Sequence, residues 1–374
     1  MKKIIIMICL LCLCFPITAY ATEYSDETEE LLKLYDFGEL NTFLEENFPN
    51  EKMNFLEMMQ GFMTGEIEFS FSLLWDLISE QFLHEFQSTK GALVHVLAIV
   101  IIAAVFRNFA GTFENGQISE MCFCVLYMLL VTICLNSFRM LMQSAVAGLG
   151  LLLEFLKLLG PVYFFAVAIA TGSTTSISFN TMILLLISIV EMVIQSLLLP
   201  LAQVYMMIRL MNDFSKEEYM SKMAEFLHTI IVWGLRILLG AVIGINMIQG
   251  MLTPAIDSVK RSVLVKTGEA IPMIGDILGG TTEVVLGTAV LIKNGIGVAG
   301  AIVCIAICMT PVIQMVVVTL MYKLTAALIQ PISEKRVVGC ISSMADGATI
   351  LLRVVFTSGV LFLVTIAMVA TTTV

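Results

Sequence analysis

The sequence has little charge for its length. Asp, Glu, Lys and Arg make up 13% of its 374 residues, whereas a soluble globular domain carries about 25%. Half the usual charge leaves too little polar surface to coat a water-soluble particle of this size. The low charge therefore excludes a cytosolic enzyme, a disordered tail protein and a secreted disulfide scaffold. Hydrophobic residues make up 59% of the chain, which is typical of a polytopic membrane protein.

The motifs of catalysis and nucleotide binding are also missing. None of the three histidines lies in H-E-x-x-H, and the chain has neither a G-x-x-x-x-G-K-[ST] phosphate loop nor a G-x-S-x-G elbow. Cys304 and Cys308 share a helix face, but neither a histidine nor a third cysteine lies nearby. We therefore expect no enzyme activity, no cofactor and no metal site, and any ATP hydrolysis would come from another protein.

The charges that are present are unevenly placed. Residues 22–90 hold 16 acidic and three basic side chains, while residues 91–374 hold 14 acidic and 15 basic ones. The net charge of −10 thus reflects one acidic segment joined to a nearly neutral membrane body. Neither part has the basic surface that binds phosphates, so we expect no nucleic-acid partner.

The N-terminus has the pattern of a secretory signal peptide. Lys2 and Lys3 precede an apolar stretch over 4–17, and Ala19-Tyr20-Ala21 fits a cleavage site. This predicts a signal peptide over 1–21 and an extracytoplasmic segment over 22–90. The alternative is an uncleaved first membrane helix, against which Pro16 and the short apolar run argue.

The acidic segment over 22–90 has helical rather than alternating periodicity. Its apolar residues fall near one face in two stripes: Leu31, Leu34, Leu40, Phe43 and Leu44, and then Leu74, Leu77, Ile78, Phe82 and Phe86. We predict a few short amphipathic helices. The stripes would form either a small core or a docking surface for a partner or for the membrane face.

The rest of the chain, 91–374, contains apolar runs of about the 20 residues that cross a bilayer. The runs lie at 91–109, 121–142, 146–170, 181–208, 226–250, 295–320 and 349–371. They are continuous, as helices in lipid must be if they are to satisfy their own backbone groups. The sequence predicts an all-α polytopic membrane helix bundle of about seven spans, with six or eight as alternatives.

The orientation of these spans is left open by the charges near their ends. Seven crossings put five cations inside, which are Arg107, Lys260, Arg261, Lys266 and Lys293. They put seven outside, which are Arg139, Arg209, Lys216, Lys222, Lys323, Lys335 and Arg336. This distribution of cations is contrary to the positive-inside rule. If an early segment such as 146–170 re-enters without crossing, the later loops swap sides and the count favours the rule.

Two stretches do not resemble ordinary spans. Gly160-Pro161 interrupts the third run, and a polar stretch over 171–176 that contains Gly172 follows it. From Gly268 to Gly300 there are eight glycines, among which Gly275 and Gly279 have the small-xxx-small spacing that lets helices approach closely. We expect 160–180 and 268–300 to line a pore or to form the packed centre. The alternative is that both are surface loops.

Ionisable residues inside apolar spans are costly and are candidates for function by default. Glu154 and Lys157 can pair at i, i+3, and Glu191 shares a face with Gln195. Three further cations lie within or at the edge of apolar runs: Arg236, Lys293 and Arg353. They would form either a polar path for ions or substrate, or neutralised pairs and side chains that reach to the interface.

Four motifs in order resemble the stage III sporulation protein AE family of endospore-forming bacteria. They are Gly-Pro-Val-Tyr at 160–163 running into Ala-Thr-Gly-Ser-Thr-Thr-Ser at 170–176, Ala-Ile-Pro-Met-Ile-Gly-Asp at 270–276, Leu-Ile-Lys-Asn-Gly-Ile-Gly at 291–297, and Lys-Leu-Thr-Ala-Ala-Leu-Ile-Gln-Pro-Ile at 323–332. The likeness covers about 150–374, and the order of signal peptide, extracytoplasmic segment and multi-span body agrees with it.

The resemblance implies a subunit of the channel-like, secretion-like apparatus that joins mother cell and forespore and supports late forespore development. It implies a place in the mother-cell membrane around the forespore. Its partners would be other membrane proteins of the stage III sporulation operon, ring-forming proteins of the intermembrane space and a separate ATPase. A free-standing permease for a small solute or ion is the alternative function.

Overall fold

A computed structural model of the chain describes residues 31–48, 54–64, 82–91, 94–102, 116–171, 175–215, 219–268 and 275–371. These residues are almost entirely helical, and no strand occurs among them. The principal helices are α3 (Gly38–Asn47), α4 (Phe55–Thr64), α6 (Gly116–Thr171), α7 (Thr175–Val193), the π-helical turn η1 (Ile194–Leu198), α8 (Leu199–Phe214), α9 (Ser221–Gly268), α10 (Gly275–Ile329) and α11 (Lys335–Thr371). The prediction of an all-α bundle is confirmed.

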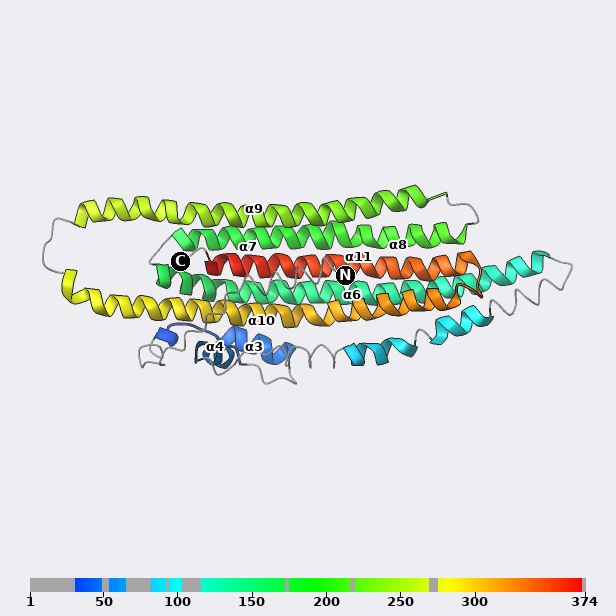
Figure 1. Cartoon of the computed structure of the whole chain (residues 1–374), viewed down its shortest axis with the longest axis horizontal. Helices are drawn as coiled ribbons and strands as arrows, with labels where there is room; N and C mark the ends of the chain where they lie inside the picture. Colours follow the sequence, from blue (N-terminus) through cyan, green and yellow to red (C-terminus); the bar gives the residue numbers. More distant parts are fainter. Residues whose placement is uncertain are drawn as a thin grey trace.

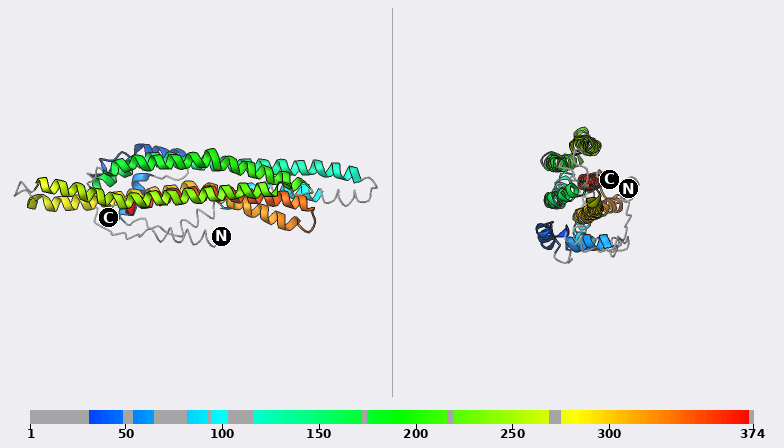
Figure 2. Two further views of the ribbon diagram at one scale, coloured as in Figure 1. Left: turned by 90° about the horizontal axis from the view of Figure 1, so that it is seen from above. Right: turned by 90° about the vertical axis from the view of Figure 1, so that its left-hand side faces the viewer.

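The long helices run up and down beside one another (Figure 1). Because α7, η1 and α8 follow one another without a break, they form a single rod. The last residues of α8 and the first residues of α9 lie at one end of the bundle. The last residues of α10 and the first residues of α11 lie at the same end (Figure 1). Seen end-on, α11 lies inside the bundle and α9 at its edge (Figure 2). Accordingly, 67% of an 18-residue apolar stretch of α11 is buried, against 22% of such a stretch of α9.

Within the residues that the structure describes, six helices are long and apolar enough to cross a membrane, close to the seven expected. They cover Phe82–Ile102, Phe123–Ala170, Met182–Phe214, Ser221–Ile248, Gly287–Ile329 and Lys335–Ala367. The difference arises because the runs expected at 121–142 and 146–170 lie on one continuous helix, α6. The three residues between them, Gln143, Ser144 and Ala145, are too few to turn the chain and include no helix breaker.

The predicted interruption at Gly160-Pro161 is wrong, since α6 continues through both residues to Thr171. Proline is tolerated inside membrane helices where neighbouring segments satisfy the freed backbone groups. Here Pro161 itself is exposed, while Leu159 and Tyr163 on either side are buried against other helices. The glycine-rich stretch is likewise helical, because α10 runs without a break from Gly275 through Gly300.

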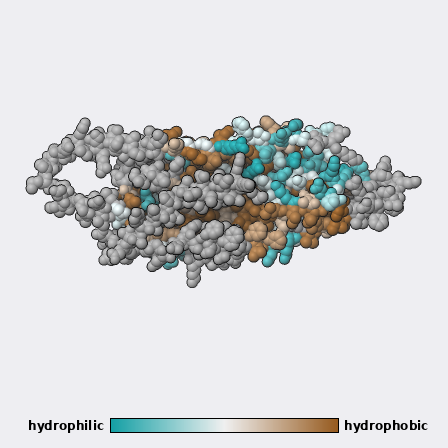
Figure 3. Space-filling model, viewed as in Figure 1, coloured by the Kyte–Doolittle hydropathy of each residue, from teal (hydrophilic) through white to brown (hydrophobic). Residues whose placement is uncertain are grey.

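The helices share two hydrophobic cores. The first lies where α8 and α9 meet α6, α10 and α11, and it includes Tyr127, Met206 and Leu351. The second joins the other part of α6 and α10 to the N-terminal helices through Phe43 and Phe155. In Figure 3, hydrophilic residues gather over the upper part of one end of the bundle, while hydrophobic residues follow its middle.

The short helices α3 and α4 of the acidic segment pack on the long helices of the same chain. Phe43 of α3 lies 5.8 Å from Phe155 of α6, measured between ring centroids. Tyr35 lies 5.4 Å from Phe165, and burial raises its pKa to about 12. Of the first predicted stripe, Leu40, Phe43 and Leu44 are buried and Leu34 is exposed. In the second stripe, Phe82 and Phe86 are exposed, whereas Leu74, Leu77 and Ile78 lie outside the described residues.

One asparagine side chain caps the N-terminus of α4, and another joins α3 to α4. The Asn54 side-chain oxygen accepts from the backbone N–H of Leu56 at 3.0 Å, as a residue that caps a helix N-terminus does. The Asn41 side-chain oxygen of α3 accepts from the backbone N–H of Phe55 at 2.9 Å. The bond between Asn41 and Phe55 joins α3 to α4, and the buried apolar residues of both helices face the bundle.

Candidate functional site

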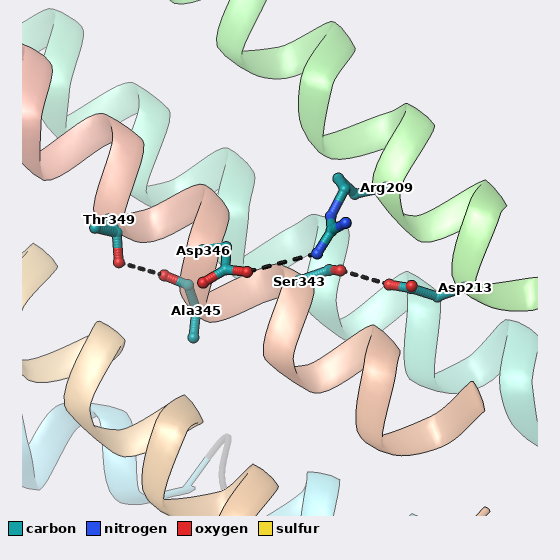
Figure 4. Close-up of polar contacts among 6 residues, drawn as sticks. All are labelled: Arg209, Asp213, Ser343, Ala345, Asp346 and Thr349. Atoms are coloured by element: carbon teal, nitrogen blue, oxygen red, sulfur yellow. Dashed lines mark hydrogen bonds and ion pairs between the residues drawn. The ribbon is translucent and has the colours of Figure 1, made fainter. Parts of the chain in front are cut away.

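Polar side chains meet between α8 and α11, near the end where α8 finishes (Figure 4). The Arg209 guanidinium lies 3.6 Å from the Asp346 carboxylate, and the Ser343 hydroxyl donates a short hydrogen bond to Asp213. Arg209 and Asp213 are four residues apart and Ser343 and Asp346 three apart, so each pair lies on one helix face. Two faces of complementary chemistry therefore meet across this contact.

Small residues on α11 allow α8 to come so close. Gly339, Ser343 and Gly347 follow one another at intervals of four residues, which places them on one face. A Cβ atom added at Gly339 would lie 3.2 Å from Asp213 Cγ, and one at Gly347 would lie 2.8 Å from Met206 Sδ. The α8–α11 contact therefore depends on these positions having little or no side chain.

The network extends to α9 and further along α11. The Tyr205 ring on α8 lies 6.0 Å from the His228 ring on α9, between centroids. The charges of Arg209, Asp346 and Arg353 act on both of these rings. We call the seven residues the α8–α11 polar cluster: Tyr205, Arg209, Asp213, His228, Ser343, Asp346 and Arg353. With a neutral histidine its two arginines and two aspartates balance, so the cluster is polar without a net charge.

A second set of contacts ties the start of α11 to the start of α6. Arg336 donates to Glu334 at 2.9 Å and lies 3.9 Å from Glu120 of α6. Its guanidinium carbon also lies 3.9 Å from the centre of the Phe123 ring, a cation–π geometry. This arginine therefore holds two helix ends in register.

An irregular turn in the middle of the α7–α8 rod carries the buried Glu191. The turn η1 is π-helical, and its closing bond runs from the Leu199 backbone N–H to the Ile194 carbonyl. Pro200 follows directly and has no N–H to donate to an α-helical partner, which accounts for the wider turn. Gln195, within the turn, donates a short hydrogen bond from Nε2 to Glu191 Oε1.

The environment of Glu191 is costly for a charge. The residue is 3% exposed, and its Oε2 is buried with no hydrogen-bond partner. Among the described residues, no Lys or Arg nitrogen lies within 4.0 Å of its carboxylate. A buried hydroxyl without a partner costs about 1–3 kcal/mol, whereas an unpaired buried ion costs several kcal/mol. Burial therefore favours the neutral acid over the carboxylate.

The structure places the residues predicted from the sequence in different surroundings. Glu154 and Lys157 are both exposed on α6, and no ion pair joins them within the described ranges. The charge of Lys157 acts instead on Glu191. Arg353 belongs to the α8–α11 polar cluster, whereas Arg236 is exposed on the peripheral α9.

The remaining predicted residues lie on helices or outside the described ranges. Lys293 is 1% exposed on α10. Gly160 is buried on α6, with Leu184 3.1 Å from where its Cβ would be. Gly275 and Gly279 lie in the first turns of α10, while Gly172 is outside the described residues. The roles proposed for these residues stay predictions.

Three glycines of the glycine-rich stretch are packing positions. A Cβ atom at Gly295 would lie 2.9 Å from Met59 Cγ of α4, and one at Gly297 would lie 2.8 Å from the Tyr163 hydroxyl. One at Gly300 would lie 2.6 Å from Leu159 Cδ2. Side chains of α4 therefore fill the space beside Gly295, and side chains of α6 fill the space beside Gly297 and Gly300.

Sequence reasoning missed most of the α8–α11 polar cluster. Asp213 and Asp346 lie near the ends of apolar runs, where charged residues are common and do not indicate function. No short sequence motif contains both of them. The spacing of Gly339, Ser343 and Gly347 was the available signal. Within the described ranges, no group of three or more His, Cys, Asp or Glu residues could hold a metal ion.

Comparison with known proteins gave one family. A family model described as stage III sporulation protein AE matches residues 53–373. The chain is also similar to stage III sporulation protein AE of Bacillus subtilis (strain 168), with 22% identity over 311 residues that cover 83% of this chain and 78% of that protein. No solved structure matches the chain.

Proposed function

Because the chain belongs to the stage III sporulation protein AE family, we propose that it is an integral membrane subunit of the channel-like apparatus that connects mother cell and forespore. It lies in the mother-cell membrane around the forespore and supports late forespore development. Its partners are other membrane proteins of the same sporulation operon, ring-forming proteins of the intermembrane space and a separate ATPase. The chain itself is a channel or platform subunit rather than an enzyme.

The length of the exposed apolar surface on α6 favours a subunit of a complex over a free-standing protein. On α6, Met121 is 72% exposed and Phe165 is 47% exposed. They are about 66 Å apart along the helix at 1.5 Å per residue, whereas the hydrocarbon core of a bilayer is about 30 Å thick. Fitting both into lipid requires a tilt of roughly 60°, beyond the roughly 0–40° of membrane helices. Part of this apolar surface needs a protein cover.

The helix count supports an extracytoplasmic N-terminal segment. Six crossings that start outside put the end of the bundle where α8 meets α9 in the cytoplasm. Seven cations then lie inside: Arg107, Arg209, Lys216, Lys222, Lys323, Lys335 and Arg336. Four lie outside: Lys260, Arg261, Lys266 and Lys293. When α6 is one crossing, the distribution of cations therefore agrees with the positive-inside rule. With seven crossings it does not.

In this topology the α8–α11 polar cluster and the acidic segment lie toward opposite sides of the membrane. The α8–α11 polar cluster lies toward the cytoplasmic end, where an ATPase would act. The acidic segment, through α3 and α4, covers the part of α6 and α10 nearer the outside. Its exposed carboxylates, among them Glu39, Glu45 and Glu46, would then face proteins of the intermembrane space.

Deletion of the gene in its own sporulating host tests the proposal. We expect forespores that complete engulfment but do not develop into heat-resistant spores, with recovery when the gene is restored. A strain that sporulates normally without the gene would contradict the proposal.

Purification separates the subunit from the alternative permease. A tagged chain extracted from sporulating cells should bring the other operon products with it, and the pure chain in liposomes should pass no solute. A permease gives the reverse result, with substrate flux by the pure chain and no stable partners.

A further inference from the structure

The carboxyl group of Glu191 stands out because nothing in its surroundings stabilises a negative charge on both oxygens. Oε1 accepts from Gln195, while Oε2 is enclosed and has no hydrogen-bond partner. The neighbouring Val190 and Ile194 are buried apolar residues. An acid in such a place either carries a proton or needs a cation beside it.

Of the cations on the helices packed against α7, one acts on the charge of Glu191. Lys157 of α6 is the charged group of the described residues that acts on Glu191, and it makes no ion pair with Glu191 within 4.0 Å. α6 also carries Glu154 on its exposed side, one turn from Lys157. α9 carries Lys222, Glu225, His228 and Arg236 among its residues with described side chains, and none of these acts on Glu191.

We propose that Glu191 is a proton-binding site inside the helix bundle, neutral at neutral pH, with Gln195 bonded to Oε1 and the proton on Oε2. Binding adds one proton to the carboxylate and release removes it, so no other reactant is needed. The site does not depend on which apparatus the protein serves.

The site lies beside the π-helical turn, and Gln195 within that turn bonds to the acid. Such turns are single-turn irregularities that frequently occur at functional sites. Gln195 is partly exposed, so it links the buried acid to the surface of the rod.

Infrared spectroscopy of the full chain in lipid nanodiscs tests the site. A protonated carboxylic acid has its own C=O stretching band, separate from that of carboxylates. We expect this band at neutral pH in the wild type and its loss in Glu191→Gln, an isosteric change. Glu154→Gln is the matched control, because it removes an exposed carboxylate from the adjacent helix, and it should retain the band. In Lys157→Gln the band should persist to higher pH.

A second measurement needs no variant, in case Glu191→Gln does not fold. Dicyclohexylcarbodiimide adds to protonated carboxyl groups in apolar surroundings, and the acid proton moves to a carbodiimide nitrogen. Peptide mapping of the labelled wild-type chain should find the adduct on Glu191 and not on Glu154, with loss of labelling as the pH rises. An infrared spectrum of Glu191→Gln identical to that of the wild type, or a wild-type chain unlabelled at Glu191, would overturn the proposal.

Discussion

Ser343 of α11 donates a hydrogen bond to Asp213 of α8, across a contact in which Gly339 and Gly347 stand one turn to either side of the serine. The polar contact and the small residues depend on each other. Without the glycines α8 could not approach, and without the hydrogen bond the buried Ser343 would lose its partner. This relationship is the basis for the first of the predictions that follow.

Gly347→Val should destabilise the bundle by about 1–3 kcal/mol, because overpacking forces neighbouring side chains to move. Its Cβ would meet Met206 Sδ at 2.8 Å and the Phe138 ring at 3.1 Å. Gly240→Val is the matched control, since nothing lies within 4 Å of a Cβ there and both variants bear the same cost of a β-branched residue in a helix. Thermal unfolding in detergent measures both, and equal midpoints would contradict the packing argument.

The Arg209–Asp346 ion pair should contribute modestly to stability. Its side chains are 30% and 42% exposed, and exposed pairs contribute about 0.2–1 kcal/mol. A double-mutant cycle of Arg209→Gln and Asp346→Asn should give a coupling free energy in that range. A coupling well above it would show that the pair is shielded from water by lipid or by another protein.

Phe43→Ala should release α3 and α4 from the bundle, because loss of a buried phenylalanine costs about 3–5 kcal/mol. Phe43 is 4% exposed and packs on Phe155 of α6. Limited proteolysis of the full chain by a glutamate-specific protease should then cut within 39–57 faster, with the long helices intact. Thr42→Ala, an exposed change on the same helix, should leave the rate unchanged. Equal rates for both variants would mean that α3 does not depend on this contact.

Single cysteines in a background without native cysteines test the six-span topology. Tyr219→Cys and Gln330→Cys lie at exposed positions beside the α8–α9 and α10–α11 connections, so both should react from the cytoplasmic side only. Glu39→Cys on α3 should react from the outside with a reagent that does not cross membranes. Reaction of position 219 and position 39 from the same side would contradict the three crossings, an odd number, that the six-span topology puts between them.

The helical membrane architecture was predictable because hydrophobicity acts locally along the chain. Each expected span lies in one of the observed helices over its described residues. The count differed because hydropathy reports that 121–170 is apolar but does not distinguish one long helix from a hairpin of two. That distinction depends on whether the chain turns at 143–145, which no breaker in the sequence demands.

The candidate polar residues were only partly predictable. Glu191 was identified because a carboxylate in an apolar run is unusual in any arrangement of helices. Asp213 and Ser343 were not, since their significance arises from a contact between residues 130 positions apart. Glu154 and Lys157 have the spacing of an ion pair, yet their side chains extend outward from α6 and do not meet.

Long apolar runs with little charge were enough to predict a helical chain that lies in a membrane. Proline was not enough to predict an irregular turn, because Pro161 and Pro311 lie inside continuous α-helices while Pro200 follows a π-helical turn. The central place of α11, the packing of α3 and α4 on α6 and α10, and the polar groups that meet became known from the folded structure alone. Helix packing depends on complementary shapes of faces that are distant in sequence, and such complementarity exists only once the helices lie side by side.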